Sequence, residues 1–202
     1  MKKLIVLAAV ALFGTQVAKA QFSKGDVILG GNLNVSTSSS KEKDVDNSKT
    51  SSTSFGISPK VGVALNPNWV IGVFAKSAFS SSKDNKDIKT TGYLITPGIF
   101  ARNYHMIGES KFAFFAEANA GYSFGSTKHD GDKTNTLNGF SVNVLPGITY
   151  FVTKHFMVEG AFGGLSYNYT QNKQESTGIK TNTSKFNFDF PKEFSLGVNW
   201  IF

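Results

Sequence analysis

Six charged side chains occur singly within stretches of alternating apolar and polar residues, and they are the residues best placed for charge chemistry. They are Lys60, Lys76, Arg102, Glu117, Glu159 and Glu193. Each falls on the polar parity of its stretch, opposite the large apolar side chains. Successive side chains of a strand point to opposite faces, so these charges share one side of a sheet. The cations precede the carboxylates along the chain, which favours ion pairs between the two halves.

Residues for nucleophilic or metal chemistry are few. There is no cysteine, which excludes thiol catalysis, disulfides and Cys-based metal sites. His105 and His155 lie beside short turns, and His129 lies in a polar tract next to an aspartate. Such a tract histidine is more often solvated than catalytic, and no His–carboxylate grouping recurs on one strand face. We therefore predict no catalytic, cofactor-binding or metal-binding residue, and no cofactor.

Eight segments with a period of two must position the six charges. They are Val27–Ser36, Phe55–Leu65, Trp69–Phe79, Thr91–Asn103, Lys111–Phe124, Phe140–Tyr150, Phe156–Tyr169 and Phe186–Phe202. Between them, three short turns alternate with four long polar tracts that we expect to be loops: 37–53, 80–90, 125–135 and 170–184. Every second connection of an up-and-down barrel lies on the same rim. The pattern therefore predicts an all-β, eight-stranded antiparallel up-and-down barrel with four long loops at one rim.

The two faces of the predicted strands indicate a transmembrane barrel. The polar parity is rich in Gly, Ala, Ser and Asn, and the large apolar side chains lie opposite. A soluble barrel would need large apolar groups inside to reach close packing, whereas a barrel in lipid needs them outside. A closed barrel also leaves no backbone group unpaired in hydrocarbon. The alternative is a soluble exported β-fold with the aromatic parity turned inward.

The first twenty residues have the pattern of a secretory signal peptide. Lys2 and Lys3 precede an apolar run that is too short to span a bilayer as a helix. Ala18 and Ala20 form a small-x-small cleavage site, so that Gln21 would begin the mature chain. We expect two parts: a cleaved signal peptide over 1–20 and a barrel domain over 21–202.

The C-terminal segment alternates up to an aromatic last residue. Ser195, Gly197, Trp200 and Phe202 match, position by position, the C-terminal signal of bacterial outer-membrane barrels. Over nearly the whole mature length the chain resembles small eight-stranded barrels of the OmpA/OmpX type, and most closely the outer membrane protein beta-barrel domain family of Bacteroidetes-like bacteria. This resemblance implies a Gram-negative outer-membrane location, contact with outer-membrane lipid, and recognition of the last strand by the barrel-assembly machinery.

Three functions compete for such a barrel. We favour a non-enzymatic structural or surface-interaction protein that meets an unknown extracellular ligand through its four polar loops. A narrow porin-like pore comes second, and a lipid-modifying enzyme is a remote third. An eight-stranded lumen is just wide enough for side chains to fill it. The six inward charges are expected to pair across it and block diffusion; the alternative is that they are merely hydrated.

Charge and proline placement complete the expectations. The formal charge is +7, but Lys2, Lys3 and Lys19 belong to the leader, and no basic run exceeds two residues. Nucleic-acid binding is therefore not expected, and we expect a monomer.

Prolines occur inside three predicted strands, at Pro59, Pro97 and Pro146. Proline is normally confined to strand edges or bulges, so bulges or local curvature are expected there.

Overall fold

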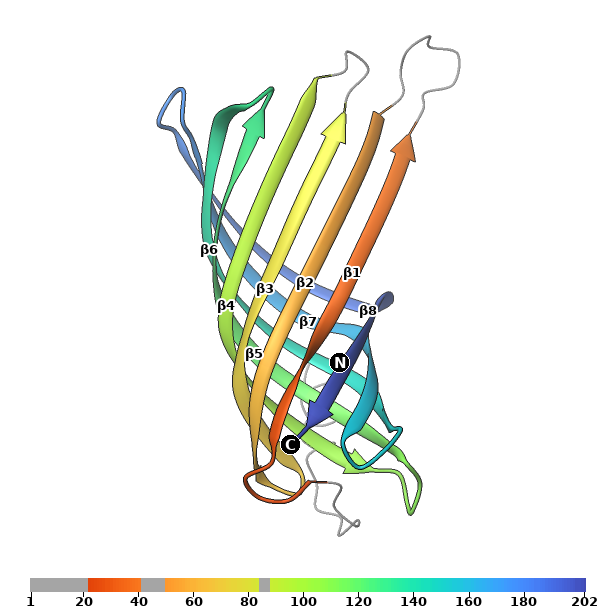
Figure 1. Cartoon of the computed structure of the whole chain (residues 1–202). Coiled ribbons are helices and arrows are strands. Elements are labelled where there is room, and N and C mark those ends of the chain that lie inside the picture. Colours follow the sequence, from red (N-terminus) through yellow and green to blue (C-terminus); the bar gives the residue numbers. More distant parts are fainter. Residues whose placement is uncertain (1–21, 41–49, 84–87) are drawn as a thin grey trace.

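The structure, a computed structural model, describes residues 22–40, 50–83 and 88–202, without the side chains of Ser36, Ser39, Ser40, Thr50 and 189–194. Its eight strands pair antiparallel in chain order and close into a barrel (Figure 1). They are β1 (Val27–Ser40), β2 (Thr50–Asn66), β3 (Trp69–Lys83), β4 (Lys89–Met106), β5 (Phe112–His129), β6 (Asp132–Phe151), β7 (Phe156–Gln174) and β8 (Lys180–Ile201). The predicted fold class is confirmed. Within this part of the chain, no helix is long and apolar enough to cross a membrane.

Large apolar side chains point outward at every second position. Exposed examples from successive strands are Leu29, Val61, Val73, Ile99, Phe114, Val142 and Leu196. Aromatic pairs lie on the same face beside the short turns: Phe112 packs on Tyr150 and Phe156 packs on Trp200, with ring centroids 4.7 and 5.6 Å apart. Such pairs form one interfacial girdle of a transmembrane barrel.

Where the structure describes the four polar tracts, they are strand over much of their length, so the connections at 125–135 and 170–184 are shorter than the predicted loops. Residues 41–49 and 84–87 of the other two tracts lie outside the described residues. β1 extends to Ser40, β3 extends to Lys83, and only Asp130 and Gly131 separate β5 from β6. The outer ends of the strands carry Ser and Thr on both faces. Water reaches both sides there, so no apolar alternation marks these residues as strand, although Thr favours β structure. The β5–β6 and β7–β8 connections at the outer rim are therefore polar hairpins.

Each of the three strand prolines pairs with the preceding strand in the chain and interrupts pairing with the following one. The partners of Pro59, Pro97 and Pro146 are Gly31, Ala75 and Ala116. On the other flank the pairing is interrupted between Ile57 and Lys60 and between Ile95 and Gly98, with the register unchanged. Between Val144 and Gly147 the register itself shifts. Proline lacks the N–H needed for a ladder bond. At each site the flank without the N–H donor faces the following strand, and pairing with the preceding strand is kept.

The apolar phase slip in β7 is a bulge, as the sequence predicts. The β7–β8 register shifts between Phe162 and Gly164. Gly163 and Gly164 have φ angles of 58° and 147°, which a residue with a Cβ rarely adopts. Glycine therefore permits the local change of direction, which lies opposite the proline interruption in β6.

The barrel closes through a short seam between β1 and β8. Ile28–Leu33 pairs with Leu196–Ile201, and the backbones of Val27 and Phe202 exchange two hydrogen bonds of 3.2 and 2.9 Å. The sequence predicts a seam over the whole of 27–36, so the observed pairing stops earlier. Figure 1 shows the two strands meeting at the end where the C-terminus lies.

Candidate functional site in the barrel lumen

Four of the six predicted lumen charges lie together inside the barrel. The Lys60 Nζ lies 3.0 Å from the Glu117 carboxylate and 3.8 Å from that of Glu159. The Arg102 guanidinium contacts the same two carboxylates. All four side chains are at least nine-tenths removed from solvent. Two cations and two carboxylates thus form one compact network, which we call the charge network.

The strands bring these four residues together in two ways. Arg102 and Glu117 are direct cross-strand partners on β4 and β5, so their side chains point to the same face. Lys60 on β2 and Glu159 on β7 lie on strands that are not neighbours, and they reach the network across the lumen. Only the narrow interior of an eight-stranded barrel lets such side chains meet.

Neutral amides hold the two carboxylates in place. The Asn119 amide donates to Glu117 at 3.0 Å and accepts from Asn143 at 2.8 Å. The Asn199 amide donates to Glu159 at 2.8 Å. A buried carboxylate needs partners for several lone pairs, and these amides supply bonds that the cations leave open.

Aromatic rings support the two cations. The Arg102 guanidinium lies 4.1 Å from the Phe115 ring centroid and donates to the Tyr104 hydroxyl at 3.0 Å. The Lys60 Nζ lies 5.4 Å from the ring centroid of Phe100. Ring faces attract cations most strongly where water is excluded. These rings connect the charge network to an apolar layer beneath it.

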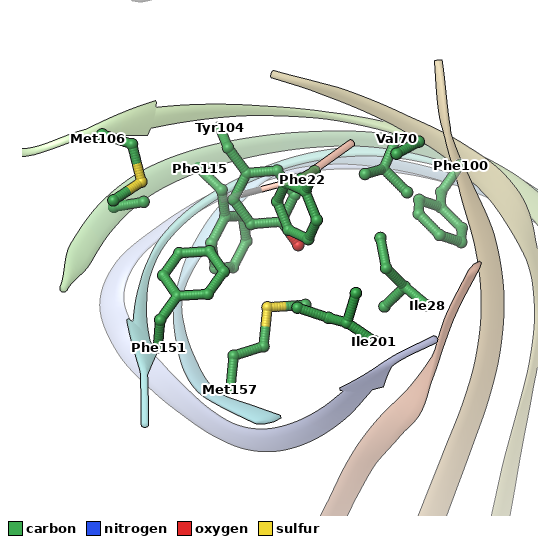
Figure 2. Close-up of a cluster of buried hydrophobic side chains, with 12 residues drawn as sticks. Phe22, Ile28, Val70, Phe100, Tyr104, Met106, Phe115, Phe151, Met157 and Ile201 are labelled. Carbon is green, nitrogen blue, oxygen red and sulfur yellow. The ribbon is translucent and has the colours of Figure 1, made fainter. Parts of the chain in front are cut away.

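The apolar layer fills the lumen between the charge network and the rim with the short turns. Figure 2 shows its side chains pointing toward one another inside the strands. Its members are Phe22, Ile28, Ala64, Val70, Phe100, Tyr104, Met106, Ala113, Phe115, Phe151, Met157 and Ile201. Phe22 comes from the segment before β1, and its ring lies 4.9 Å from that of Tyr104 and 5.6 Å from that of Phe151. The N-terminal segment therefore helps to close this end.

Large apolar groups also lie inside the barrel, on an inner face that the sequence predicts to be rich in small and polar residues. Inward glycines make the room for them. A Cβ on Gly147 would lie 2.2 Å from the Phe115 ring, and one on Gly72 would lie 2.8 Å from the Phe100 ring. The inner glycines were predicted, but their pairing with inward rings depends on register between strands. The alternation of residues along one strand does not predict the register between strands.

The remaining predicted lumen charges are not placed in the network. Lys76 lies on the inward parity of β3 beyond Phe74, where it is exposed, and no described carboxylate lies within 4 Å of it. The side chain of Glu193 lies outside the described residues, as do the predicted cleavage residues Ala18, Ala20 and Gln21. Their roles stay predictions.

The predicted assembly residues occupy both faces of β8. Trp200 and Phe202 are exposed on the lipid face, whereas Ser195 and Gly197 lie on the inner parity. A Cβ on Gly197 would lie 2.7 Å from the Asn32 amide and 3.0 Å from Glu159. Gly197 therefore also leaves space for the charge network.

Two of the histidine rings bond residues of neighbouring strands. The His129 ring bonds the Thr90 hydroxyl at 3.0 Å, and the His155 ring bonds the Ile201 carbonyl oxygen at 3.1 Å. No group of three His, Asp or Glu residues within the described ranges could hold a metal ion. The chemistry that the lumen supports is mutual neutralisation of buried charges.

Comparison with known proteins agrees with this architecture. The family model for the outer membrane protein beta-barrel domain matches residues 5–202. No curated protein matches significantly. The solved structure of OprG from Pseudomonas aeruginosa is 17% identical, with a TM-score of 0.51, and the match covers 91% of this chain and 99% of that one.

Two further solved structures resemble the chain at lower scores. Neisserial surface protein A is 18% identical, with a TM-score of 0.49, and 89% of this chain and 98% of that one are covered. The Escherichia coli outer membrane protein W is 14% identical, with a TM-score of 0.47, and 87% and 97% are covered. With a match over nearly its whole length, the chain belongs to the outer membrane protein beta-barrel domain family and is an outer-membrane protein.

Proposed function

We propose that this protein is a non-enzymatic, non-conducting barrel with a structural or surface-interaction role at its polar outer hairpins. The observation that carries the proposal is the double closure of the lumen. The charge network spans it from β2 to β7, and the apolar layer fills the space below. A hydrated ion would have to separate buried ion pairs and then cross a dry layer, both of which are costly.

Conductance in planar lipid bilayers tests this proposal. The full-length mature barrel should insert without steady unitary currents. The variant Phe22→Ala with Phe100→Ala and Phe115→Ala is the comparison, because it removes three of the four phenylalanine rings of the apolar layer while leaving all four charges. Steady open currents from the unmodified barrel would refute the closed lumen.

A narrow porin-like pore is the second candidate, and one observation favours it. Above the charge network the inner face is polar, with Thr96 bonded to Ser123 at 2.8 Å, Asn143 bonded to Asn119, and Lys76 exposed. Only the two closing layers would have to move to leave a polar path. Currents that appear at particular voltages, and that lose this voltage dependence when Arg102 is replaced, would support this candidate.

The outer hairpins are the proposed interaction surface. A recess of about 490 Å³ lies between the β5–β6 and β7–β8 hairpins, lined by Asp132, Lys133, Thr134, Asn135, Gln174, Glu175 and Ser176. The Glu175 carboxylate contacts Lys133 at 3.6 Å and Lys173 at 3.3 Å. Exposed polar and charged groups on rigid hairpins suit contact with a surface or ligand outside the cell. Replacing the turn Asp130–Gly131 with an epitope tag tests whether this tip is accessible on intact cells.

We also propose that the barrel is exported through cleavage after Ala20 and is assembled as a monomer by the barrel-assembly machinery. Two observations support this proposal: Phe22 packs in the lumen directly after the expected cleavage site, and the last strand exposes Trp200 and Phe202. Mass spectrometry of the purified barrel tests the cleavage, with Gln21 as the expected first residue. Light scattering of the detergent complex tests the monomer.

A further inference from the structure

Outward lysines stand at one constant spacing beyond the outer aromatic residues. Lys83, Lys89, Lys128 and Lys173 lie four residues toward the outer rim from Phe79, Tyr93, Phe124 and Tyr169, on β3, β4, β5 and β7. Because side chains alternate, each lysine shares the lipid-facing parity of its aromatic residue. Four strands repeat one arrangement of a ring followed by a cation.

This spacing sets the height of the lysines relative to the membrane. Four residues span about 13 Å of strand, or about 10 Å along the membrane normal for the usual tilt of a transmembrane barrel. Aromatic rings mark the interface, so the lysine backbones lie at the outer edge of the headgroup region. Their long side chains can bend back to bring the ammonium groups to headgroup level.

Lysine faces lysine across three pairs of neighbouring strands. The cross-strand partners are Lys83 with Lys89, Lys128 with Lys133, and Lys173 with Lys180. Directly opposed like charges destabilise a sheet. An anion bound between the two lysines of a pair would therefore reduce their repulsion, and there are three such pairs. We call these six residues the lysine belt.

Protein carboxylates neutralise only part of the lysine belt. The Glu175 carboxylate forms ion pairs with both Lys133 and Lys173. Lys83 also has an interaction partner. The other member of each pair, Lys89, Lys128 or Lys180, has no described carboxylate within 4 Å. One exposed ammonium group in each pair thus remains available to an external anion.

We propose that the lysine belt binds the phosphate groups of glycolipids in the outer leaflet of the outer membrane. The constant height above the aromatic residues supports a lipid rather than a free ligand, because a soluble anion would require no fixed distance from the bilayer. The lysines also follow the outer circumference of β3 to β8, and of the six only Lys133 lines the recess described above. The inference does not depend on whether the lumen conducts.

The direct test compares two lipids with the unmodified protein. The full mature barrel in detergent is titrated with diphosphorylated lipid A and with dephosphorylated lipid A of the same acyl composition, in about 0.15 M salt. The phosphorylated lipid should bind at least about ten-fold more tightly. Equal affinities for the two lipids would overturn the proposal. So would full competition by millimolar inorganic phosphate, because the site would then recognise the free anion.

A matched pair of variants locates the site. Lys89→Gln, Lys128→Gln and Lys180→Gln together should reduce binding of diphosphorylated lipid A by about ten-fold or more. The control removes three exposed lysines at the opposite rim, Lys24, Lys111 and Lys154, also by Gln, and should keep the affinity within about two-fold. Equal losses in both variants would contradict the belt. Heat-modifiable electrophoretic mobility shows that each variant is folded.

Discussion

Arg102 on β4 donates hydrogen bonds to both carboxylate oxygens of Glu159 on β7, across the lumen. The same guanidinium also bonds Glu117 on the neighbouring strand. One buried cation therefore joins three strands and balances one of the two negative charges of the carboxylates. Lys60 supplies the second positive charge from β2, so the charge network is neutral only as a whole.

Replacing Arg102 by Met should destabilise the barrel by about 3–5 kcal/mol, because two buried carboxylates would share a single lysine. Urea-dependent unfolding in lipid vesicles measures this loss. Arg102→Met combined with Glu159→Leu should recover part of it, since Lys60 and Glu117 remain as a neutral pair. Lys76→Met, at an exposed position outside the network, should change stability by less than about 0.5 kcal/mol. An equal effect at both sites would argue against the network.

Removing the Phe22 ring should weaken the inner closure. Phe22→Ala deletes the ring that packs on Tyr104 and Phe151, and such a substitution costs about 3 kcal/mol in a packed interior. The temperature at which the folded gel band disappears should fall. Val152→Ala, at an exposed position in the β6–β7 turn, serves as the control and should leave it nearly unchanged. No change with Phe22→Ala would show that the N-terminal segment does not seal the lumen.

Inward glycines should tolerate alanine only where no ring or backbone stands opposite. In Gly147→Ala the new methyl group would lie 2.2 Å from the Phe115 ring and 2.6 Å from the Gly160 carbonyl oxygen, which predicts a loss of about 1–3 kcal/mol. Gly56→Ala meets its nearest atom at 3.4 Å and should be nearly neutral. Vesicle unfolding compares the two. Equal stability of the two variants would mean that the Phe115 ring can move aside.

The β7–β8 hairpin tip should loosen in acid. The Thr136 hydroxyl and the nearby Lys173 hold the pKa of Glu175 below its ordinary value of 4.5. A carboxyl group whose pKa is lower in the folded state than in the unfolded state stabilises the fold at any pH above the unfolded-state pKa. This stabilisation is lost as the pH falls through the folded-state pKa. Amide protection factors around Lys173 should therefore be constant above about pH 5 and fall at lower pH. Glu175→Gln should remove this dependence, and its persistence in that variant would assign it to other groups.

Phe202 should matter more for assembly than for folding. Phe202→Ala keeps the backbone bonds to Val27 but removes the exposed terminal ring. We expect normal refolding in detergent micelles and a reduced level of heat-modifiable barrel in the outer membrane of cells. A variant that is impaired in both settings would indicate a structural role instead, and unchanged levels in cells would contradict recognition of the last strand.

The strand number, the antiparallel order and the outer apolar face all follow from alternation in the sequence. The lipid-facing parity of Leu196, Val198, Trp200 and Phe202 is exposed as predicted. Alternation is a local property, so a single strand is enough to detect it. It fails at Ser and Thr tracts, where both faces meet water, and these parts of β1, β3 and β7 were predicted as loops.

The alternation of apolar and polar residues is not enough to predict which side chains meet across the lumen. The parity of Lys60, Arg102, Glu117 and Glu159 points them inward, but the height at which they meet depends on the tilt of the strands and on the register shifts. Lys76 shares the same parity and lies elsewhere because it is higher along β3. Phe115 and Met157 point inward against the expected polarity. They are buried because they belong to the apolar layer. Side chains from several strands form this layer, so the pattern of one strand cannot predict it.

The prolines of β2, β4 and β6 divide the outer parts of these strands from the closed part of the barrel. Pro59 directly precedes Lys60, and Pro146 pairs with Ala116, the neighbour of Glu117, so the interrupted ladders border the charge network. Fraying that begins at a hairpin tip meets an existing break in the hydrogen bonds before it reaches the buried charges. A protease could therefore nick the exposed tips, or surface variation could remodel them, while the membrane seal below stays intact.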